Sequence, residues 1–148
     1  MARADLHLHT RHSARATDWL LRKVDFPSSC SAPGELYRVL REKGFDFVTF
    51  TDHDTIDGCL EIAGQPGAFI SEEITAFFPE DEVKVHLLAW GITEEQHREI
   101  QSLRRDIYAL AAWLKGQDIA HAVAHPFWPV DERLSLDHWQ RLILLFRH

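Results

Sequence analysis

The sequence predicts a single α/β domain built around a mainly parallel sheet. Segments typical of strands alternate along the chain with segments typical of helices or turns, which is the pattern of repeated βα units. The 148 residues are one domain's length of chain, with no internal repeat or linker that would divide it. Potential metal ligands recur at or near the carboxyl ends of the predicted strands, the edge at which sites form in barrels and open sheets.

The first predicted strand covers residues 5–9 and contains a His-x-His pair. His7 and His9 are two residues apart, so their imidazoles leave the same face of a strand, while Leu6 and Leu8 take the opposite face. Imidazole is a common ligand for Zn, Mn and Fe, and two imidazoles on one face can hold one ion. An isolated His-x-His is also consistent with two polar residues on a half-exposed strand.

The next segment, residues 10–33, has a length that is often found in functional loops, and a short helix at 18–24 is expected within it. The later elements follow from hydrophobic periodicity, β-branched and aromatic runs, and Gly and Pro stop signals. In order, they are a helix at 32–43, a strand at 45–51, a short helix at 56–63, a strand at 68–71, a turn at 78–82, a strand at 83–90, one long helix at 93–116 that begins with a capping box, a strand at 119–124 and an amphipathic helix within 136–146.

The composition is that of an ordinary globular protein, 45% hydrophobic and 26% charged. A net charge of −7 argues against a surface that coats nucleic acid, although bound divalent cations could still attract an anionic substrate. Cys30 and Cys59 form neither a disulfide framework nor a Cys-based zinc site and are expected to be free thiols in a reducing compartment. We find no signal peptide or membrane span, so we expect a cytoplasmic protein without a membrane partner.

Histidines and carboxylates gather at the predicted strand ends, where a single barrel mouth would bring them together. Imidazole and carboxylate without thiolate suit a catalytic Zn, Mn or Fe site better than a structural one. A carboxylate can bridge two ions, and such a pair can clamp a phosphoryl group. The strand-end set is His7, His9, His53 flanked by Asp52 and Asp54, Glu73, His86 and His125.

Four other histidines are expected to have structural roles and not to bind metal. His97, His138 and His148 fall on predicted helices or at the chain end and are expected to be exposed to solvent. His121 lies four residues before His125, so the two share a strand face, and we expect His121 to be a packed, hydrogen-bonded core residue.

Together, these motifs resemble those of the PHP (polymerase and histidinol phosphatase) family. The resemblance implies a distorted (β/α)7 barrel with up to three divalent metals at its carboxyl face, and phosphatase or nuclease activity. The similar segments cover nearly the whole chain and follow the family's order: Asp5-Leu-His-Leu-His-Thr10, Thr51-Asp-His-Asp-Thr55, Ser71-Glu-Glu-Ile74, the strand with His86, and Ala124-His-Pro126.

The resemblance also implies how two metal sites would be shared among the strand-end residues. His7 and His9 would bind a first ion, and Glu73 would bridge it to a second. His86 and His125 would complete the protein ligands of the second ion.

A third metal site would depart from the family's pattern. His53 would belong to it, and Asp52 and Asp54 would be supporting groups that orient His53 and its neighbours. The family commonly places another acidic residue or His several positions after His-x-His-Thr. Ala14 stands there in this sequence, so His12 and Asp18 are the nearby substitutes, with His12 the candidate ligand.

The resemblance further predicts that residues 1–148 are the larger, N-terminal part of a PHP-type phosphoesterase domain. About five strands are expected, because the family's last strands and its final Asp-x-His motif do not occur in this sequence. A partial barrel would leave strand edges and apolar surface uncovered. We therefore expect a further C-terminal segment or an oligomer to cover the open edge.

Three functional hypotheses follow. In the first, the protein is a metal-dependent phosphoesterase in which a metal-bound hydroxide attacks the phosphorus of a small phosphorylated substrate or nucleotide, and no Ser or Cys nucleophile is needed. Arg11 and Arg15, on the loop above the expected metal sites, are the candidate phosphate-binding residues. The second hypothesis is a PHP-like interaction or structural module with weak metal binding or none. The third is an amidohydrolase-type C–N hydrolase, a class that also opens with His-x-His on a barrel strand.

Overall fold

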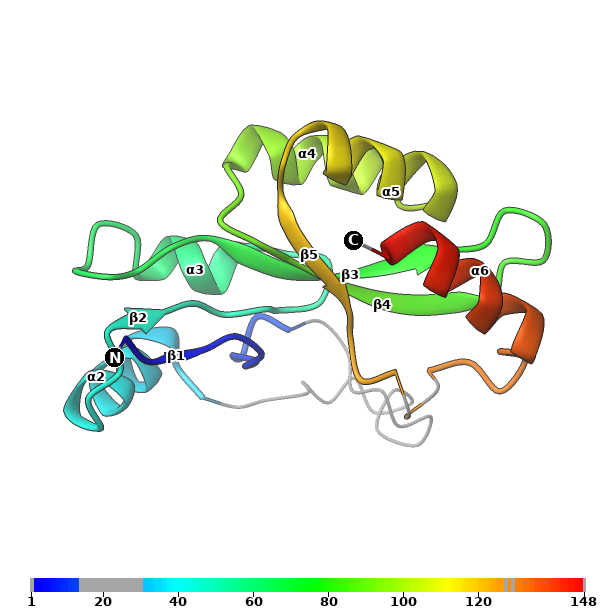
Figure 1. Ribbon diagram of the computed structural model, residues 1–148. Coiled ribbons are helices and arrows are strands. Elements are labelled where there is room, and N and C mark those ends of the chain that lie inside the picture. Colours follow the sequence, from blue (N-terminus) through cyan, green and yellow to red (C-terminus); the bar gives the residue numbers. More distant parts are fainter. Residues whose placement is uncertain (1, 14–30, 127, 129, 148) are drawn as a thin grey trace.

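The computed structural model describes residues 2–13, 31–126, 128 and 130–147, which form a mixed α/β fold (Figure 1). The predicted helix at 18–24, Ala14, Arg15, Cys30 and His148 lie outside the described residues. The elements, in chain order, are β1 (Ala4–Asp5), α2 (Pro33–Glu42), β2 (Phe47–Val48), α3 (Asp57–Glu61), β3 (Ser71–Phe77), β4 (Lys84–Trp90), α4 (Glu94–Leu103), α5 (Ile107–Gly116), β5 (Ala120–Val123) and α6 (Leu136–Phe146).

The strands form two sets that differ in direction. β1 and β2 pair in parallel, whereas β3, β4 and β5 form an antiparallel sheet in that order. Parallel bridges from Val48 to Ala68 and from His53 to Glu73 connect the segment after β2 to the segment that leads into β3. The predicted parallel arrangement is therefore found from β1 to the start of β3 and is wrong for β4.

The reversal of β4 has a local cause in the short turn that follows β3. The N–H of Phe78 donates to the carbonyl of Val83 over 3.0 Å, so the chain doubles back at once. A parallel neighbour would need a crossover of about a dozen residues or more. Consistent with this, no closed barrel forms from the residues that the structure describes.

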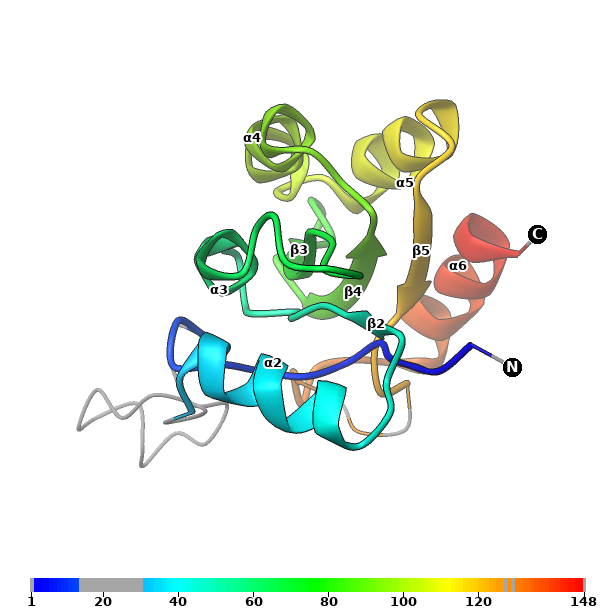
Figure 2. The ribbon, with the colours of Figure 1, turned by 90° about the vertical axis from the view of Figure 1, so that its left-hand side faces the viewer.

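The two faces of the antiparallel sheet have opposite roles. Directly paired residues share a face, so Ile74 of β3 and Leu87 of β4, both fully buried, lie on one face and belong to the same core cluster as residues of α4, α5 and α6. Figure 2 shows these helices on the side of the sheet away from α2. Glu73 and His86 occupy the alternate positions and therefore point to the opposite face, where β1, β2 and α2 lie. The helices supply the main apolar core on the first face, with Ile100, Ile107, Leu110, Leu114 and Leu142.

The strand that carries Glu73 is longer than predicted and begins later. The expected strand at 68–71 placed Glu73 beyond the strand end, but Glu73 is the third residue of β3, and both Glu72 and Glu73 are fully buried. Two adjacent charged residues seldom lie inside a buried strand unless both are paired. The strand end predicted from the sequence pattern therefore lies too early in the chain.

The predicted long helix at 93–116 is also wrong, because the chain forms two helices with a break between them. α4 starts with the expected capping box and ends before Arg104. Asp106 then caps α5, and its side chain accepts hydrogen bonds from the N–H groups of Tyr108 and Ala109. The break allows Arg104 to donate to the carboxylate of Asp54 near the candidate site. α6 has the predicted extent, and no helix in the described ranges is long and apolar enough to cross a bilayer.

The Asp106 cap gives a first testable prediction. The Asp106→Ala variant should lower the free energy of unfolding by about 1 kcal/mol, because two N–H groups at the start of α5 lose their acceptor. Urea titration of both proteins measures this difference. Asp106→Asn, which keeps the acceptor oxygen, should retain most of the stability. An equal loss in both variants would contradict a capping role.

Candidate metal centre

Glu73 is the point at which side chains from separate parts of the chain converge. Its carboxylate is fully buried and lies on the face of β3 opposite to the helices. The histidines with a nitrogen within ion-pair distance of Glu73 are His7, His9, His53, His86 and His125.

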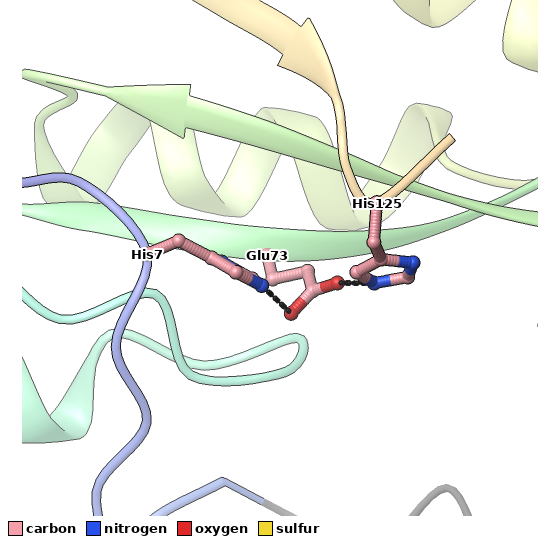
Figure 3. Close-up of side chains that lie close together, drawn as sticks. All are labelled: His7, Glu73 and His125. Carbon is pink, nitrogen blue, oxygen red and sulfur yellow. Dashed lines mark hydrogen bonds and ion pairs between the residues drawn. The ribbon is translucent and has the colours of Figure 1, made fainter. Parts of the chain in front are cut away.

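The two oxygens of Glu73 face different groups of imidazoles. Oε1 lies 2.9 Å from His86 Nδ1 and 2.9 Å from His125 Nε2, and these two nitrogens are 3.4 Å apart. Figure 3 shows His125 and His7 approaching the carboxylate from opposite sides. Strand pairing accounts for the position of His86, because Glu73 is paired with Leu88, two residues further along β4. His86 lies near the amino end of β4, so its predicted place at a carboxyl end is wrong.

The second oxygen, Oε2, faces the three histidines of the first half of the chain. It lies 3.1 Å from His9 Nε2, 3.6 Å from His53 Nδ1 and 3.7 Å from His7 Nε2. Two sets of ligand atoms are each compact enough to hold one ion, His7 with Glu73 and His125, and His9 with His53 and Glu73. The carboxylate of Glu73 belongs to both sets.

Burial and the neighbouring imidazoles set the charge of the carboxylate. Burial alone would raise the pKa of Glu73, but the interactions with His125, His86 and His9 outweigh it and hold the pKa of this carboxyl well below its usual range. The contact with Glu73 in turn raises the pKa of His125. Glu73 is therefore an ionised carboxylate at neutral pH.

Two histidines show the opposite effect. Burial lowers the pKa of His53 from 6.5 to about 4, despite the attraction of Glu73. Burial also lowers the pKa of His7. Both imidazoles are thus neutral at pH 7, which is the protonation state that binds a metal ion.

The donor set fits a divalent metal ion. Neither Glu73 Oε2 nor His53 Nδ1 makes a well-formed hydrogen bond, although both atoms are buried. Buried polar atoms normally have a partner, so this pair marks a place where a further group would bind. Nitrogen and carboxylate donors without thiolate suit Zn, Mn or Fe. A metal ion between these atoms would satisfy both of them.

Backbone hydrogen bonds hold the contributing segments side by side. Thr51 N–H donates to Leu8 O over 2.8 Å, Glu73 N–H donates to Asp52 O over 3.1 Å, and Asp54 N–H donates to Glu73 O over 2.9 Å. These contacts align the segment of His7 and His9, the segment of His53 and the start of β3. β1 ends at Asp5, so the predicted strand at 5–9 is wrong from residue 6 onward, and backbone hydrogen bonds outside a regular strand hold this segment in place.

Asp52 and Asp54 brace the backbone on either side of His53. Asp52 accepts hydrogen bonds from Thr10 N–H at 2.6 Å and Thr10 Oγ1 at 2.7 Å, and it is 1% exposed. Asp54 accepts from Thr75 N–H at 2.7 Å and forms an ion pair with Arg104. Asp54 has a φ of 56°, a conformation that Asp tolerates better than most residues. Asp52 thus ties the end of the His-x-His segment to the segment of His53.

Gly58 gives a second testable prediction, because it packs directly against this clamp. A Cβ at position 58 would collide with Asp52 Oδ2 and lie 2.7 Å from Thr10 Oγ1. Gly58→Ala should therefore destabilise the protein by about 1–3 kcal/mol and weaken metal binding, as measured by urea unfolding and zinc titration. Gly34→Ala is the matched control, since nothing lies within 4 Å of that Cβ. Equal behaviour of both variants would contradict the close packing.

The predicted loop residues lie away from the two sets of ligand atoms. Arg11 and His12 both contact the carboxylate of Glu61, Arg11 at 2.8 Å. His12 thus has a carboxylate partner of its own, and Arg11 is half exposed. Arg15 lies outside the described residues.

Two histidines that were expected to be exposed have structural contacts instead. His97 Nδ1 lies 3.0 Å from the buried carboxylate of Glu72, a contact that raises the pKa of His97. His138 is 8% exposed and completes the capping box at the start of α6. The expectation of exposure is wrong for both. α4 turns His97 toward Glu72 of β3, and α6 turns His138 toward Asp81, which lies in the turn between β3 and β4. His121 is buried, as expected, and its Nδ1 contacts the carbonyl of Ile119.

Two hydroxyl groups to which the sequence analysis assigned no role contact two of the histidines. Thr51 Oγ1 lies 3.0 Å from His7 Nδ1, and Ser13 Oγ lies 3.0 Å from His9 Nδ1. Metal-ligating histidines usually bond a second group through the nitrogen that does not bind the ion. That general requirement is the only signal in the sequence that could have pointed to these hydroxyls.

Comparisons with known proteins found partial similarities. No family model matches the chain. A stretch of 59 residues, 40% of the chain, is 41% identical to an uncharacterized protein from Methanocaldococcus jannaschii and covers 33% of that protein. The chain thus matches about a third of the length of this curated relative.

Two solved structures align with part of this chain. An amidohydrolase from Chromobacterium violaceum, with bound sulfate and no metal, aligns with a TM-score of 0.47 and 22% identity over 78% of this chain and 38% of its own. A protein from Bifidobacterium adolescentis, described provisionally as a metal-dependent phosphoesterase, aligns with a TM-score of 0.41 and 26% identity over 68% of this chain and 32% of its own. The functional assignment below rests on the geometry of the site itself.

Proposed function

We propose that this chain carries the centre of a metal-dependent phosphoester hydrolase that acts on a small phosphorylated substrate or nucleotide. The observation that carries the proposal is the convergence of five imidazoles on one buried, ionised carboxylate. No other group of three or more potential ligands is found among the described residues outside the two that share Glu73.

The resemblance of the motifs assigns the residues to two or three ions. On that assignment His7 and His9, with Glu73, would hold one ion, and His86 and His125, with Glu73, would hold a second. The compact groups of ligand atoms offer a different division, His7 with Glu73 and His125, and His9 with His53 and Glu73. His53 would bind a further ion or share one with His9. Zn, Mn and Fe all suit this donor set.

When bound, divalent ions act as Lewis acids and lower the pKa of water that they coordinate. The protein contributes charge balance to that chemistry. Glu73 supplies one negative charge, and an imidazole that binds an ion through a ring nitrogen is uncharged, so a centre loaded with divalent ions would keep a positive charge. A residual positive charge at a surface-accessible site favours an anionic substrate such as a phosphoester over a neutral amide.

The protein also holds the ligands before any ion arrives. His53 is neutral at pH 7 and does not have to lose a proton. Backbone pairing holds Glu73 beside His53, and Asp52 holds the segment that follows His9. The site therefore needs little rearrangement to bind an ion, which favours affinity.

A chelation and reloading experiment tests the proposal. Purified protein is treated with a chelator, reloaded with Mn²⁺ or Zn²⁺, and assayed with p-nitrophenyl phosphate, bis-p-nitrophenyl phosphate and short nucleotides. Hydrolysis should disappear on chelation, return on reloading and be lost in His9→Ala. His97→Gln is the control, because His97 bonds to Glu72 on the helix side of the sheet. Hydrolysis that survives both chelation and His9→Ala would overturn the proposal, and metal binding without hydrolysis would favour a binding module.

A further inference from the structure

The hydroxyl of Ser13 links two of the candidate metal ligands. Ser13 is 1% exposed, and its Oγ accepts a hydrogen bond from His53 N–H at 3.1 Å. The same oxygen lies 3.0 Å from Nδ1 of His9, while the other ring nitrogen of His9 lies 3.1 Å from Glu73 Oε2. Ser13 therefore contacts the His9 ring on the side opposite to the carboxylate.

The position of this hydroxyl is determined by the backbone and not by the metal. Ser13 N–H donates to Thr10 O over 3.1 Å, which closes a tight turn directly after His9. Thr10 is in turn held by two hydrogen bonds to Asp52. The hydroxyl is thus in place beside His9 before an ion binds.

The protons of His9 must be arranged differently with and without an ion. Without one, Nε2 of His9 lies 3.1 Å from a carboxylate oxygen of Glu73, which can only accept, so this distance favours the ring proton on Nε2 and makes Nδ1 an acceptor. Ser13 then has to donate its hydroxyl proton to Nδ1. When an ion takes the Nε2 lone pair, the ring proton belongs on Nδ1, and Ser13 has to accept it.

A hydroxyl can fill both roles by rotating about its Cβ–Oγ bond, whereas a carbonyl or an ionised carboxylate can only accept. The proton that leaves Nε2 passes to solvent and Nδ1 takes one proton up from solvent, so the exchange moves the ring proton without changing the number of ring protons. In each tautomer both ring nitrogens of His9 have a partner.

We propose that Ser13 is a positioning residue that allows His9 to exchange tautomers as an ion enters or leaves. The proposal rests on the metal centre described above and deepens it. A similar hydroxyl contact lies at His7, because Thr51 Oγ1 lies 3.0 Å from Nδ1 of His7, accepts from Leu8 N–H at 3.2 Å and also lies 3.4 Å from Leu8 O. Both imidazoles of the His-x-His pair therefore have a hydroxyl partner on the side away from Glu73.

Nitrogen NMR tests this exchange directly. Protein labelled with ¹⁵N at histidine is examined at about pH 8 with chelator and then with Zn²⁺, and His9→Gln assigns the signals of His9. Long-range ¹H–¹⁵N spectra distinguish a protonated ring nitrogen from an unprotonated one. In wild type, the His9 proton should be on Nε2 without zinc and on Nδ1 with zinc.

Zinc titration of variants gives the second readout. Ser13→Ala should weaken zinc binding about 10–100-fold, as is typical when the outer partner of a ligating His is removed. Ser13→Thr keeps the hydroxyl and should bind zinc nearly as well as wild type. Ser102→Ala, which removes an exposed hydroxyl on α4, should have no effect. If the added methyl group of Ser13→Thr prevents folding, the pair Thr51→Ala and Thr51→Ser makes the same comparison at His7.

The outcomes separate this proposal from the proposed function. A His9 proton on Nδ1 both with and without zinc overturns the exchange, and so does wild-type zinc affinity in Ser13→Ala. A wild type that binds no zinc overturns both proposals. A wild type that binds zinc and exchanges tautomers but hydrolyses no phosphoester supports the role of Ser13 and overturns only the proposed activity.

Discussion

Glu73→Gln is expected to weaken zinc and manganese binding by more than about 100-fold and to abolish phosphoester hydrolysis. This loss is larger than the one expected when a residue that only supports a ligand is replaced. The substitution keeps the shape of the side chain but removes its charge. Glu73 is the one group that both sets of candidate ligand atoms share among the described residues, so both sets lose their carboxylate at once. Isothermal titration with Zn²⁺ and Mn²⁺ measures the loss.

Glu72→Gln is the matched control for this experiment. Glu72 is the neighbouring residue and is equally buried, but it faces the helices, where it accepts hydrogen bonds from His97 and Gln101 on α4. Its substitution should affect stability and leave zinc affinity close to that of wild type. Equal losses of affinity in Glu72→Gln and Glu73→Gln would show that the effect is structural, and would contradict the metal centre.

The second large effect is a pH-dependent loss of stability in the metal-free protein that arises at His53. Its pKa is about 4 in the folded protein and 6.5 without burial. Between these values the unfolded chain binds a proton that the folded chain does not bind, so stability rises with pH through this window and falls as the pH is lowered. A shift of this size corresponds to a penalty of about 2–3 kcal/mol below pH 5.

Comparison with His53→Gln isolates this contribution. Glutamine does not titrate, so the wild type should lose about 2–3 kcal/mol relative to the variant between about pH 7.5 and about pH 4.5. Urea unfolding with chelator present at several pH values measures both profiles. Other titrating groups contribute to both proteins and largely cancel in the difference. Parallel profiles for wild type and variant would contradict a buried, neutral His53.

Local sequence signals were sufficient where a contact depends on neighbouring residues. The capping box at the start of α4 and the extent of α6 are present as predicted, because both depend on side chains within a few residues of each other. The same signals failed at Arg104–Asp106. There the apolar stripe continues through a break that a cap and a contact with Asp54 stabilise.

The direction of β4 was predictable in principle. The turn at 78–82 was recognised in the sequence, and a connection this short between two strands requires antiparallel pairing. The alternation of strands and helices elsewhere in the chain outweighed that signal. His86 nevertheless shares a face with Glu73, because pairing with β3 restores the alternation of faces regardless of strand direction.

The sequence by itself determined the residue types of the candidate centre, since His-x-His, His53, Glu73, His86 and His125 can be recognised by their spacing and their positions near predicted strands. Only the tertiary structure decided which of them meet. It placed Glu73 between all five imidazoles, directed His12 to Glu61, and brought Ser13 and Thr51 against the rings of His9 and His7. The contacts of His53 and His86 with Glu73 depend on backbone pairing between distant segments, whereas a local turn brings Ser13 to His9. The burial that keeps His53 neutral exists only after that pairing has formed.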